Sequence, residues 1–395
     1  MAEIAVFGYG TVGSGVVEVI DRNAELMRGR GADLHVRYVL DIRDFPGDPI
    51  SSRLVHDIDD ILKDPEISVV CETMGGATFA YEYSRKALER GISVCTSNKE
   101  LVEAKGAELM QIAKAHGCSY MFEASVGGGI PLIRTINDAL SAERIDRIYG
   151  ILNGTTNYIL TKMDECGAGF DEVLKEAQEL GYAEKDPTAD VEGHDACRKI
   201  AILASLVSGR KVNWSDIETE GISGIDTEDF RYAKELGCSI KLIAMCDFNN
   251  GCTAMVSPRL ISADSPLNCV KGVFNGVLIH SDMLDDSMYY GRGAGKLATA
   301  SAVVADAFEC VRFNGKEVGR GWSEEVLKLS DPGDMKGRFF VRVDNANAAA
   351  AAAALGATDV LKHENETGLK SAEMSEKEFR EKLSGLSGVI KFIRF

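Results

Sequence analysis

The sequence is short of positive charge. Its 395 residues carry 44 Lys+Arg against 61 Asp+Glu, which gives a formal net charge of −17. Phosphates and anionic lipids are bound by clustered lysine and arginine, so this deficit argues against nucleic acid or a membrane surface as a partner. The deficit is also uneven. Residues 315–395 hold 13 Lys+Arg and 13 Asp+Glu, so the whole excess of negative charge belongs to residues 1–314.

Other features are missing as well. No run of ~20 uncharged apolar residues is present to cross a bilayer, and the first residues show no basic region typical of a secretory leader. The ten cysteines include no C-x-x-C pair and no cluster with histidine at zinc spacing. Most of them lie in apolar runs, as buried thiols in a reducing compartment do. The sequence therefore predicts a soluble, cytoplasmic protein without structural zinc.

The first third of the chain alternates short apolar strands with helices. At about 150 residues per domain, the length corresponds to two to three domains. The predicted strands are residues 4–7, 35–40, 68–71, 92–96 and 120–123. Their apolar residues are continuous rather than alternating, which is typical of a parallel sheet covered on both faces.

The first predicted strand runs into a loop with the glycine spacing of a dinucleotide-binding turn. The loop residues are Gly8, Tyr9, Gly10, Thr11, Val12 and Gly13. Gly8 permits a tight turn, Gly10 lets backbone amides approach a pyrophosphate, and Gly13 lets the following helix pack closely. The helix's positive end then holds the anion, which suits a protein with few basic residues. The pattern predicts a Rossmann-type nucleotide domain.

The second predicted strand ends at residues that bear on the choice of dinucleotide. Asp41 stands where an acidic residue binds the ribose hydroxyls of NAD. Arg43 follows two residues later and would suit the 2′-phosphate of NADP, and a solvated ion pair between the two is an equal alternative. The sequence leaves NAD and NADP open.

An acidic segment, residues 181–199, enters a strongly apolar helix. Asp195 and Lys199 are one turn apart at the start of that helix, and residues 200–207 are almost wholly apolar. A lysine at the start of a buried helix is expected in a cleft, where its charge matters. The alternative is a surface ion pair worth a few tenths of a kcal/mol.

Two further segments carry candidate chemistry. Lys99 follows the carboxyl end of a predicted parallel strand, where open α/β sheets bind ligands; it is otherwise a charge at a helix start. Glu123 precedes a glycine-rich stretch, residues 124–131, whose carbonyls suit a hard cation. The alternative for this stretch is a flexible crossover between domains.

Together these segments resemble homoserine dehydrogenase, in the family's order and at compatible spacing. The matching segments are residues 8–13, 97–99, 123–131, 153–157, 181–199 and 291–295. The resemblance covers residues 1–312. It implies reversible NAD(P)-dependent reduction of L-aspartate 4-semialdehyde to L-homoserine, a step toward threonine and methionine.

The resemblance also implies roles for individual residues. Lys199 would donate the proton to the carbonyl oxygen, and Lys99 would be a second proton-transfer or orienting group beside the cofactor. The residues implied in substrate binding are Glu184, Asp190 and Asp195. Those implied at the cofactor, besides Lys99 and the loop at 8–13, are Gly181 and Gly295. A sodium ion would be held by Glu123 and by the carbonyls of Val126, Gly128 and Ile130. A homodimer through the sheet of the middle region is implied as well.

The predicted organisation is α/β with three parts. A nucleotide domain spans residues 1–134 and is completed by 292–314; a mixed α+β substrate and dimerisation domain spans 135–291. A linker at 315–334 leads to a short module at 335–395 that resembles an ACT-type regulatory domain. The usual Asp-x-Pro-Gly loop of that module is replaced by Asp344-Asn345-Ala346-Asn347, so a packing role stands beside a regulatory one.

Two other functions stay open at the level of sequence. Aspartate semialdehyde dehydrogenase needs a nucleophilic cysteine; Cys197 lies on the substrate helix, with His194 as its only candidate base. A non-catalytic protein that senses NAD(P) and an amino acid would combine the glycine loop with the ACT-like tail. That reading leaves Lys99, Glu184, Asp195 and Lys199 without a role.

Overall fold

The computed structural model describes residues 1–313 and 321–395, and these divide into two compact units. The first comprises Met1–Arg144, Ala201–Trp214 and Tyr289–Leu327; the second comprises Ile145–Ile200, Ser215–Met288 and Lys328–Phe395. Residue 314, at the edge of the predicted nucleotide domain, and residues 315–320 of the predicted linker lie outside the described residues. The predicted domain boundaries remain predictions.

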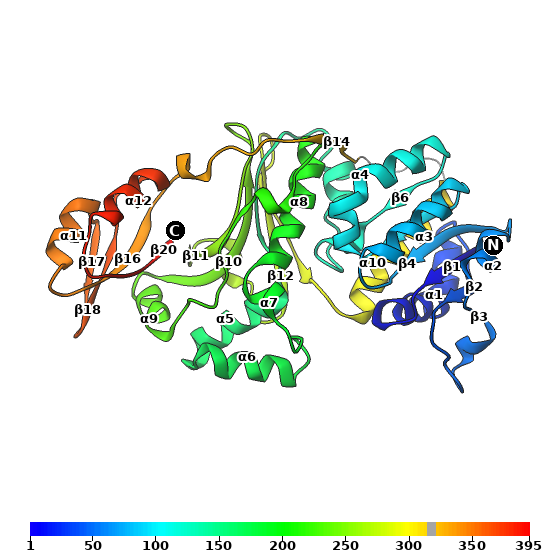
Figure 1. Cartoon of the computed structure of the whole chain (residues 1–395), viewed down its shortest axis with the longest axis horizontal. Coiled ribbons are helices and arrows are strands. Elements are labelled where there is room, and N and C mark those ends of the chain that lie inside the picture. The colour runs from blue at the N-terminus through cyan, green and yellow to red at the C-terminus, as the bar shows by residue number, and fades with distance from the viewer. Residues whose placement is uncertain (314–320) are drawn as a thin grey trace. The chain divides into compact units, whose positions relative to one another are not determined.

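The first unit is built on a six-stranded parallel sheet (Figure 1). Its strands are β1 (Ala2–Phe7), β2 (Leu34–Leu40), β3 (Leu54–Val55), β4 (Ile67–Glu72), β5 (Ser93–Thr96) and β6 (Tyr120–Met121). They are ordered β3-β2-β1-β4-β5-β6, and every pair is parallel. The order reverses between β1 and β4, so the carboxyl ends of these two strands form the crevice where such sheets bind ligands. The predicted parallel sheet is confirmed.

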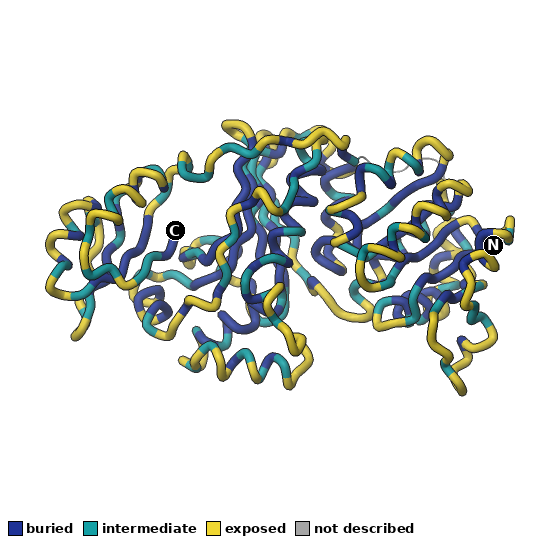
Figure 2. The backbone as a smooth tube through the Cα atoms, in the orientation of Figure 1, coloured by how far each residue is buried: buried dark blue, intermediate teal, exposed yellow. Residues whose placement is uncertain are grey.

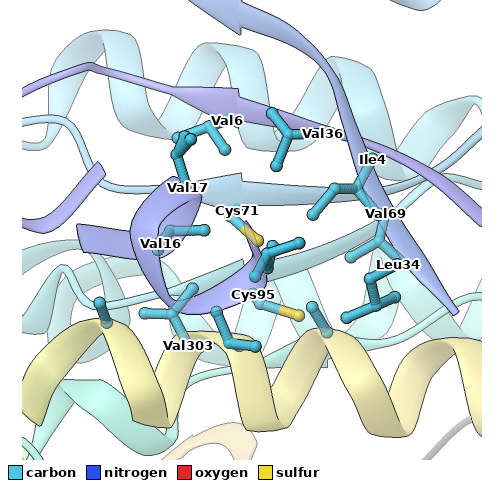
Figure 3. Close-up of a cluster of buried hydrophobic side chains, with 14 of the residues drawn as sticks. Ile4, Val6, Val16, Val17, Leu34, Val36, Val69, Cys71, Cys95 and Val303 are labelled. Carbon is cyan, nitrogen blue, oxygen red and sulfur yellow. The ribbon is translucent and has the colours of Figure 1, made fainter. Parts of the chain in front are cut away.

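Helices in two groups cover this sheet. The helices are α1 (Thr11–Gly29), α2 (Ile58–Leu62), α3 (Thr78–Glu89), α4 (Lys99–Ala115) and α10 (Lys296–Arg312). α1 packs against α10, and α3 packs against α4. Figure 3 shows Val16 and Val303, from α1 and α10, pointing into one apolar cluster with strand residues such as Val6. α10 thus belongs to this core although it follows most of the second unit along the chain. A small pair of strands, β8 (Arg210–Lys211) and β14 (Ser323–Val326), completes the unit.

The second unit contains a larger, mixed sheet. Its first strands are β7 (Ile145–Ile151), β9 (Glu218–Thr219), β10 (Cys238–Asp247), β11 (Thr253–Ser262), β12 (Phe274–Ser281) and the start of β13 (Asp285–Arg292), whose residues from Tyr289 on belong to the first unit. β12, β7, β10 and β11 are neighbours in that order and antiparallel. The helices are α5 (Gly154–Cys166), α6 (Phe170–Glu179), α7 (Thr188–Val191), α9 (Thr227–Glu235) and the start of α8 (His194–Ser208), whose residues from Ala201 on belong to the first unit. The short α7 lies within the acidic segment of residues 181–199.

The C-terminal residues extend the same sheet. They form β16 (Phe339–Asp344), α11 (Ala348–Leu355), β17 (Asp359–Lys362), β18 (Glu366–Lys370), α12 (Glu376–Ser384) and β20 (Val389–Arg394), with a small pair β15 (Lys336–Gly337) and β19 (Met374–Ser375). The strand order β20-β16-β18-β17 and the chain order β-α-β-β-α-β are those of a ferredoxin-like fold. β20 also pairs in parallel with β11, so the sheet is continuous into the middle region. The ACT-like character of this segment remains a prediction.

The strands of the sheets are more deeply buried than the helices that cover them (Figure 2). The central strands are buried along most of their length, whereas α3, α6 and α12 expose one side to solvent. Across the described ranges 1–313 and 321–395, no helix is both long enough and apolar enough to span a membrane.

Candidate functional site

The glycine loop lies at the switch point of the parallel sheet, between β1 and α1. Gly8 has a φ of +88°, a conformation that favours glycine. A Cβ on Gly13 would lie 1.9 Å from the Gly8 carbonyl oxygen, so only glycine lets α1 approach the loop this closely. A Cβ on Gly10 would meet nothing within 4 Å, which leaves its backbone open to a ligand. The three glycines therefore occupy the positions that a dinucleotide cradle requires.

Asp41 and Arg43 form one side of a cavity of about 410 Å³ beside this loop. Both oxygens of the Asp41 carboxylate accept hydrogen bonds from the Arg43 guanidinium, at 3.0 and 2.9 Å. Asp41 also accepts the backbone amides of Tyr9, at 2.7 Å, and Arg43, at 3.0 Å. These donors, Arg43 foremost, hold the pKa of Asp41 at about 2. Both candidate specificity residues thus line the crevice, and they are already bound to each other.

Lys99 is the first residue of α4 and is half-buried. The preceding Asn98 caps the helix by accepting the Leu101 amide at 3.1 Å, and its side-chain amide donates to the Gly76 carbonyl at 2.7 Å. Lys99 therefore begins a helix whose N-terminal cap is bonded to the turn after β4. This is the carboxyl-end edge of the sheet that the sequence predicted for it.

The second unit brings three of the predicted residues together around Asn153. Lys199 Nζ donates to Asp195 Oδ2 at 2.7 Å and to the Leu152 carbonyl at 2.7 Å. The Asn153 side-chain amide donates to the same Asp195 oxygen at 2.8 Å and to Asp190 Oδ1 at 2.6 Å. Asp195 is 5% exposed and Lys199 is 9% exposed. The lysine at the start of α8 is therefore a buried ammonium beside a buried carboxylate, not a surface ion pair.

Glu184 stands apart from this cluster. It is exposed, and within the described part of the chain its carboxylate has no hydrogen-bond partner; its backbone carbonyl accepts from the Gln178 side chain at 3.0 Å. Gly181 has a φ of +73° just after α6, and Gly295 a φ of +117° where it caps α10. The positive φ at each of these two positions favours glycine.

Glu123 is buried and binds backbone rather than solvent. Its two carboxylate oxygens accept the amides of Leu132 at 2.6 Å, Ile133 at 3.0 Å and Arg134 at 2.8 Å. Burial raises the pKa of Glu123 despite these bonds. A carboxylate offers about four lone-pair positions, so one is left for a cation beside three amides. The described residues contain no group of three or more His, Cys, Asp or Glu that would hold a metal.

The glycine-rich stretch after Glu123 is packed rather than flexible. Gly128 has a φ of +53°, and a Cβ there would lie 2.5 Å from the Gly293 carbonyl oxygen. The Gly129 amide donates to the Arg292 carbonyl at 3.1 Å. These glycines let two backbone segments, distant in sequence, run against each other within the first unit.

Sequence reasoning left some polar contacts out of the site. Asn153, which bridges Asp190 and Asp195, follows a strand and caps α5 by accepting the Thr156 amide; an asparagine at such a position was the available signal. Thr73 donates its hydroxyl to the Gly8 carbonyl at 2.9 Å, and nothing in the local sequence marks it.

Comparison with known proteins now bears on this geometry. Residues 8–123 match the sequence model of the NAD binding domain of homoserine dehydrogenase, and residues 131–308 match the model of homoserine dehydrogenase itself. The chain belongs to the homoserine dehydrogenase family. Homoserine dehydrogenase of Bacillus subtilis is 42% identical over 351 residues, 86% of this chain and 80% of that protein. The enzyme of Synechocystis is 44% identical over 318 residues, 78% and 73% of the two chains.

Solved structures agree with the assignment. A homoserine dehydrogenase from Thiobacillus denitrificans superposes with a TM-score of 0.92 at 34% identity, and the match covers 100% of this chain and 97% of that one. A hyperthermophilic archaeal homoserine dehydrogenase mutant, solved in complex with NADPH, gives a TM-score of 0.67 at 30% identity over 78% and 97%. Homoserine dehydrogenases are NAD(P)-dependent oxidoreductases, so this chain is an enzyme and not a non-catalytic sensor. Cys197 is fully buried, which does not suit the nucleophile of the other alternative.

Proposed function

We propose that this homoserine dehydrogenase interconverts L-aspartate 4-semialdehyde and L-homoserine, with Lys199 as the proton donor in the reducing direction. The pairing of buried Lys199 with buried Asp195 carries the proposal. The nicotinamide cofactor supplies a hydride to the carbonyl carbon. The chain must then supply a proton to the oxygen, which becomes an alkoxide.

Lys199 has the donors that this step needs. An ammonium has three N–H groups; the Lys199 ammonium gives one to Asp195 and one to the Leu152 carbonyl, which leaves the third for a substrate oxygen. Asp195 compensates the buried charge and fixes the side chain's direction. A cation held in a site shielded from water stabilises the developing alkoxide and then donates its proton.

The carboxylates of the same cluster suit the substrate's ammonium group. Asp190 and Asp195 are held by one Asn153 side chain, and the exposed Glu184 adds a third carboxylate to the segment between α6 and α8. With Lys199 paired to Asp195, negative charge remains to meet a cationic substrate. We propose Lys99, at the carboxyl end of β5, as the orienting group on the cofactor side.

The test is Lys199→Met, with Lys185→Met as the matched control because Lys185 is an exposed lysine of the same acidic segment. Steady-state kinetics with aspartate semialdehyde should show kcat lowered by about 10²- to 10⁴-fold, the contribution of a general acid. NADPH binding, followed by its fluorescence, should not change. A Lys199→Met enzyme that keeps most of its kcat would sink the assignment.

The contacts of Asp41 support NADP(H) over NAD(H). The Asp41 carboxylate already accepts four hydrogen bonds, two from the Arg43 guanidinium and two from backbone amides, which uses about all of its lone pairs. It has none left for a ribose hydroxyl. The Arg43 side chain is 58% exposed at the cavity and keeps its Nη1 hydrogens for a 2′-phosphate.

We also propose the sodium site of the family at the Glu123 segment. The remaining lone pair of Glu123 and the carbonyls of Val126, Gly128 and Ile130 would hold the ion, since sodium takes oxygen ligands. The sharp backbone of Gly128 against Gly293 supports this, because it fixes the stretch that carries these carbonyls. The ion would serve a structural role and take no part in the reaction.

The mixed sheet supports a homodimer. Tyr149 and Leu278 are half-buried partners on β7 and β12, packed against an apolar cluster that includes Met245. Apolar surface of this kind gains burial when a second copy covers it. Sedimentation velocity of the whole chain reports the dimer directly.

We propose that the C-terminal segment packs rather than regulates. β20 continues the sheet from β11, and the loop that replaces Asp-x-Pro-Gly is closed on itself: Asp344 accepts the Asn347 backbone and side-chain amides at 2.9 and 2.8 Å. Added threonine is then expected to leave the rate unchanged.

A further inference from the structure

A separate cavity lies in the second unit, between α5, the turn from α9 into β10, and the segment before β12. Its volume is about 250 Å³. Three lysines line it: Lys234, Lys241 and Lys271. Neither the proposed reaction nor the family assignment gives this cavity a task.

Lys241 is the unusual member of the three. It is 3% exposed, and its ammonium donates to the Val270 carbonyl at 2.6 Å and to the Asn157 side-chain oxygen at 3.3 Å. Both partners are neutral. Within residues 1–313 and 321–395, no carboxylate lies within ion-pair distance of Lys241. Asp164 and Glu165 act on it only at longer range. Burying a cation without a contacting counter-charge is costly, so burial outweighs these two carboxylates and lowers the pKa of Lys241 to about 8.

The other two lysines already have carboxylate partners. Lys234 Nζ lies 3.3 Å from an Asp164 oxygen, and Lys271 Nζ lies 2.7 Å from a Glu165 oxygen. In each pair the positive and the negative charge cancel. The positive charge of Lys241 is therefore the excess charge of the cavity, and its third N–H is available there.

We propose that this cavity binds a small anion whose oxygens, of a carboxylate or a phosphate, accept from Lys241. The cavity is below the usual range for drug-sized ligands, so it suits an anion of a few heavy atoms. Lys271, exposed at the same cavity, adds a second cation that can turn from Glu165 toward the ligand. The anion supplies Lys241 with a counter-charge at contact distance, since Asp164 and Glu165 are paired with Lys234 and Lys271.

The site can be tested by isothermal titration calorimetry of the full chain with inorganic phosphate and, separately, with acetate. Ionic strength is held constant with chloride, and NADPH is kept saturating so that the nucleotide cradle is filled. One ion should bind per chain, and Lys241→Met should weaken its affinity at least about tenfold, the loss of one charge-assisted hydrogen bond. Lys162→Met is the control, because Lys162 is on α5 but pairs with Glu176 outside the cavity.

The choice of variants keeps the test decisive. Should Lys241→Met fold poorly by circular dichroism, Lys271→Met at the exposed side of the cavity should still weaken binding several-fold. Binding of phosphate alone identifies a phosphate site, and binding of acetate as well identifies a general carboxylate site. The proposal is overturned if neither phosphate nor acetate gives more heat than chloride. It is also overturned if Lys241→Met and Lys271→Met bind the anion with the same affinity as the control Lys162→Met.

Discussion

The Thr96 hydroxyl donates a hydrogen bond to the Glu72 carboxylate at 2.5 Å, and so joins the carboxyl ends of the neighbouring strands β5 and β4. Glu72 also accepts the Met74 amide at 2.7 Å, and Thr96 accepts the Asn98 amide at 2.9 Å. The fully buried Glu72 thereby ties the turn after β4 to the loop after β5 that leads into Lys99. Burial raises the pKa of Glu72 to about 7.

This raised pKa predicts a pH-dependent stability of the first unit. Between the ordinary pKa of 4.5 and about 7, the unfolded chain ionises Glu72 while the folded unit keeps it protonated. The free energy of unfolding therefore falls as pH rises through this window, by about 3 kcal/mol from this group. Below the window both states are protonated, and above it both are ionised, so the contribution is flat outside it.

Trp214 and Trp322 both lie in the first unit, so their fluorescence during urea unfolding reports this unit. Glu72→Gln should remove most of the fall between about pH 5 and pH 8. Glu66→Gln, an exposed carboxylate just before the same strand, should retain the wild-type slope. Equal slopes for Glu72→Gln and wild type would contradict the assignment of this pKa.

The bond between Asp41 and Arg43 predicts a change of cofactor preference. Arg43→Ala removes the guanidinium proposed for the 2′-phosphate and frees the Asp41 oxygens that it occupies. The ratio of kcat/KM for NADPH to that for NADH should fall about tenfold or more, because a charge-assisted contact is lost with one cofactor only.

Arg28→Ala is the control for this change, since Arg28 is similarly exposed and also pairs with an aspartate, Asp33, in the same unit. Its cofactor ratio should equal that of wild type. An Arg43→Ala enzyme with an unchanged ratio would show that the 2′-phosphate is read elsewhere.

The sequence predicted those features whose cause is local. The glycine loop was recognisable because the strand, the turn and the helix that give Gly8, Gly10 and Gly13 their tasks are contiguous. The pairing of Asp195 with Lys199 follows in the same way from one turn of α8. Features that depend on distant contacts were less accessible: the sequence offered a flexible crossover at Gly128, whereas that glycine is needed because the Gly293 backbone packs against it.

The C-terminal segment shows the same limit. No helix was predicted from the sequence at Glu376–Ser384, where α12 lies. Its sequence, EKEFREKLS, is mostly charged, and only Phe379 and Leu383 join the apolar cluster beneath it. Two apolar residues are too few to give a clear helical pattern of apolar positions. The pairing of β20 with β11 joins segments far apart in the chain and leaves no local pattern at all.

A substitution at Asn153 tests the proposed substrate role of Asp190 and Asp195 without removing the N-terminal cap of α5. Asn153→Asp keeps a side-chain oxygen to accept the Thr156 amide but replaces the amide that donates to Asp190 and Asp195. A third carboxylate then repels the other two. We expect kcat/KM for the semialdehyde to fall at least about tenfold, with NADPH affinity unchanged. Equal losses in both would point to misfolding instead of a lost contact.

The ion pairs of Arg342 are expected to stabilise the C-terminal strands. Its guanidinium, on β16, lies 2.7 Å from both Asp226 and Asp229 at the start of α9, and it also binds Glu366 of β18. Asp229 is fully buried. Arg342→Met leaves this carboxylate with Lys391 as its remaining cation in the described structure. Breaking such a buried network costs about 3–5 kcal/mol.

Hydrogen–deuterium exchange read by mass spectrometry localises this loss. In Arg342→Met, peptides from β16 and β20 should exchange faster, because their local opening costs less free energy, while peptides from β1 and β4 in the first unit should not change. Arg338→Met removes an exposed arginine beside the same strand and should leave exchange as in wild type. If β16 and β20 stay as protected in Arg342→Met as in Arg338→Met, the buried arginine does not hold this segment, and the sheet pairing of β20 with β11 must do so alone.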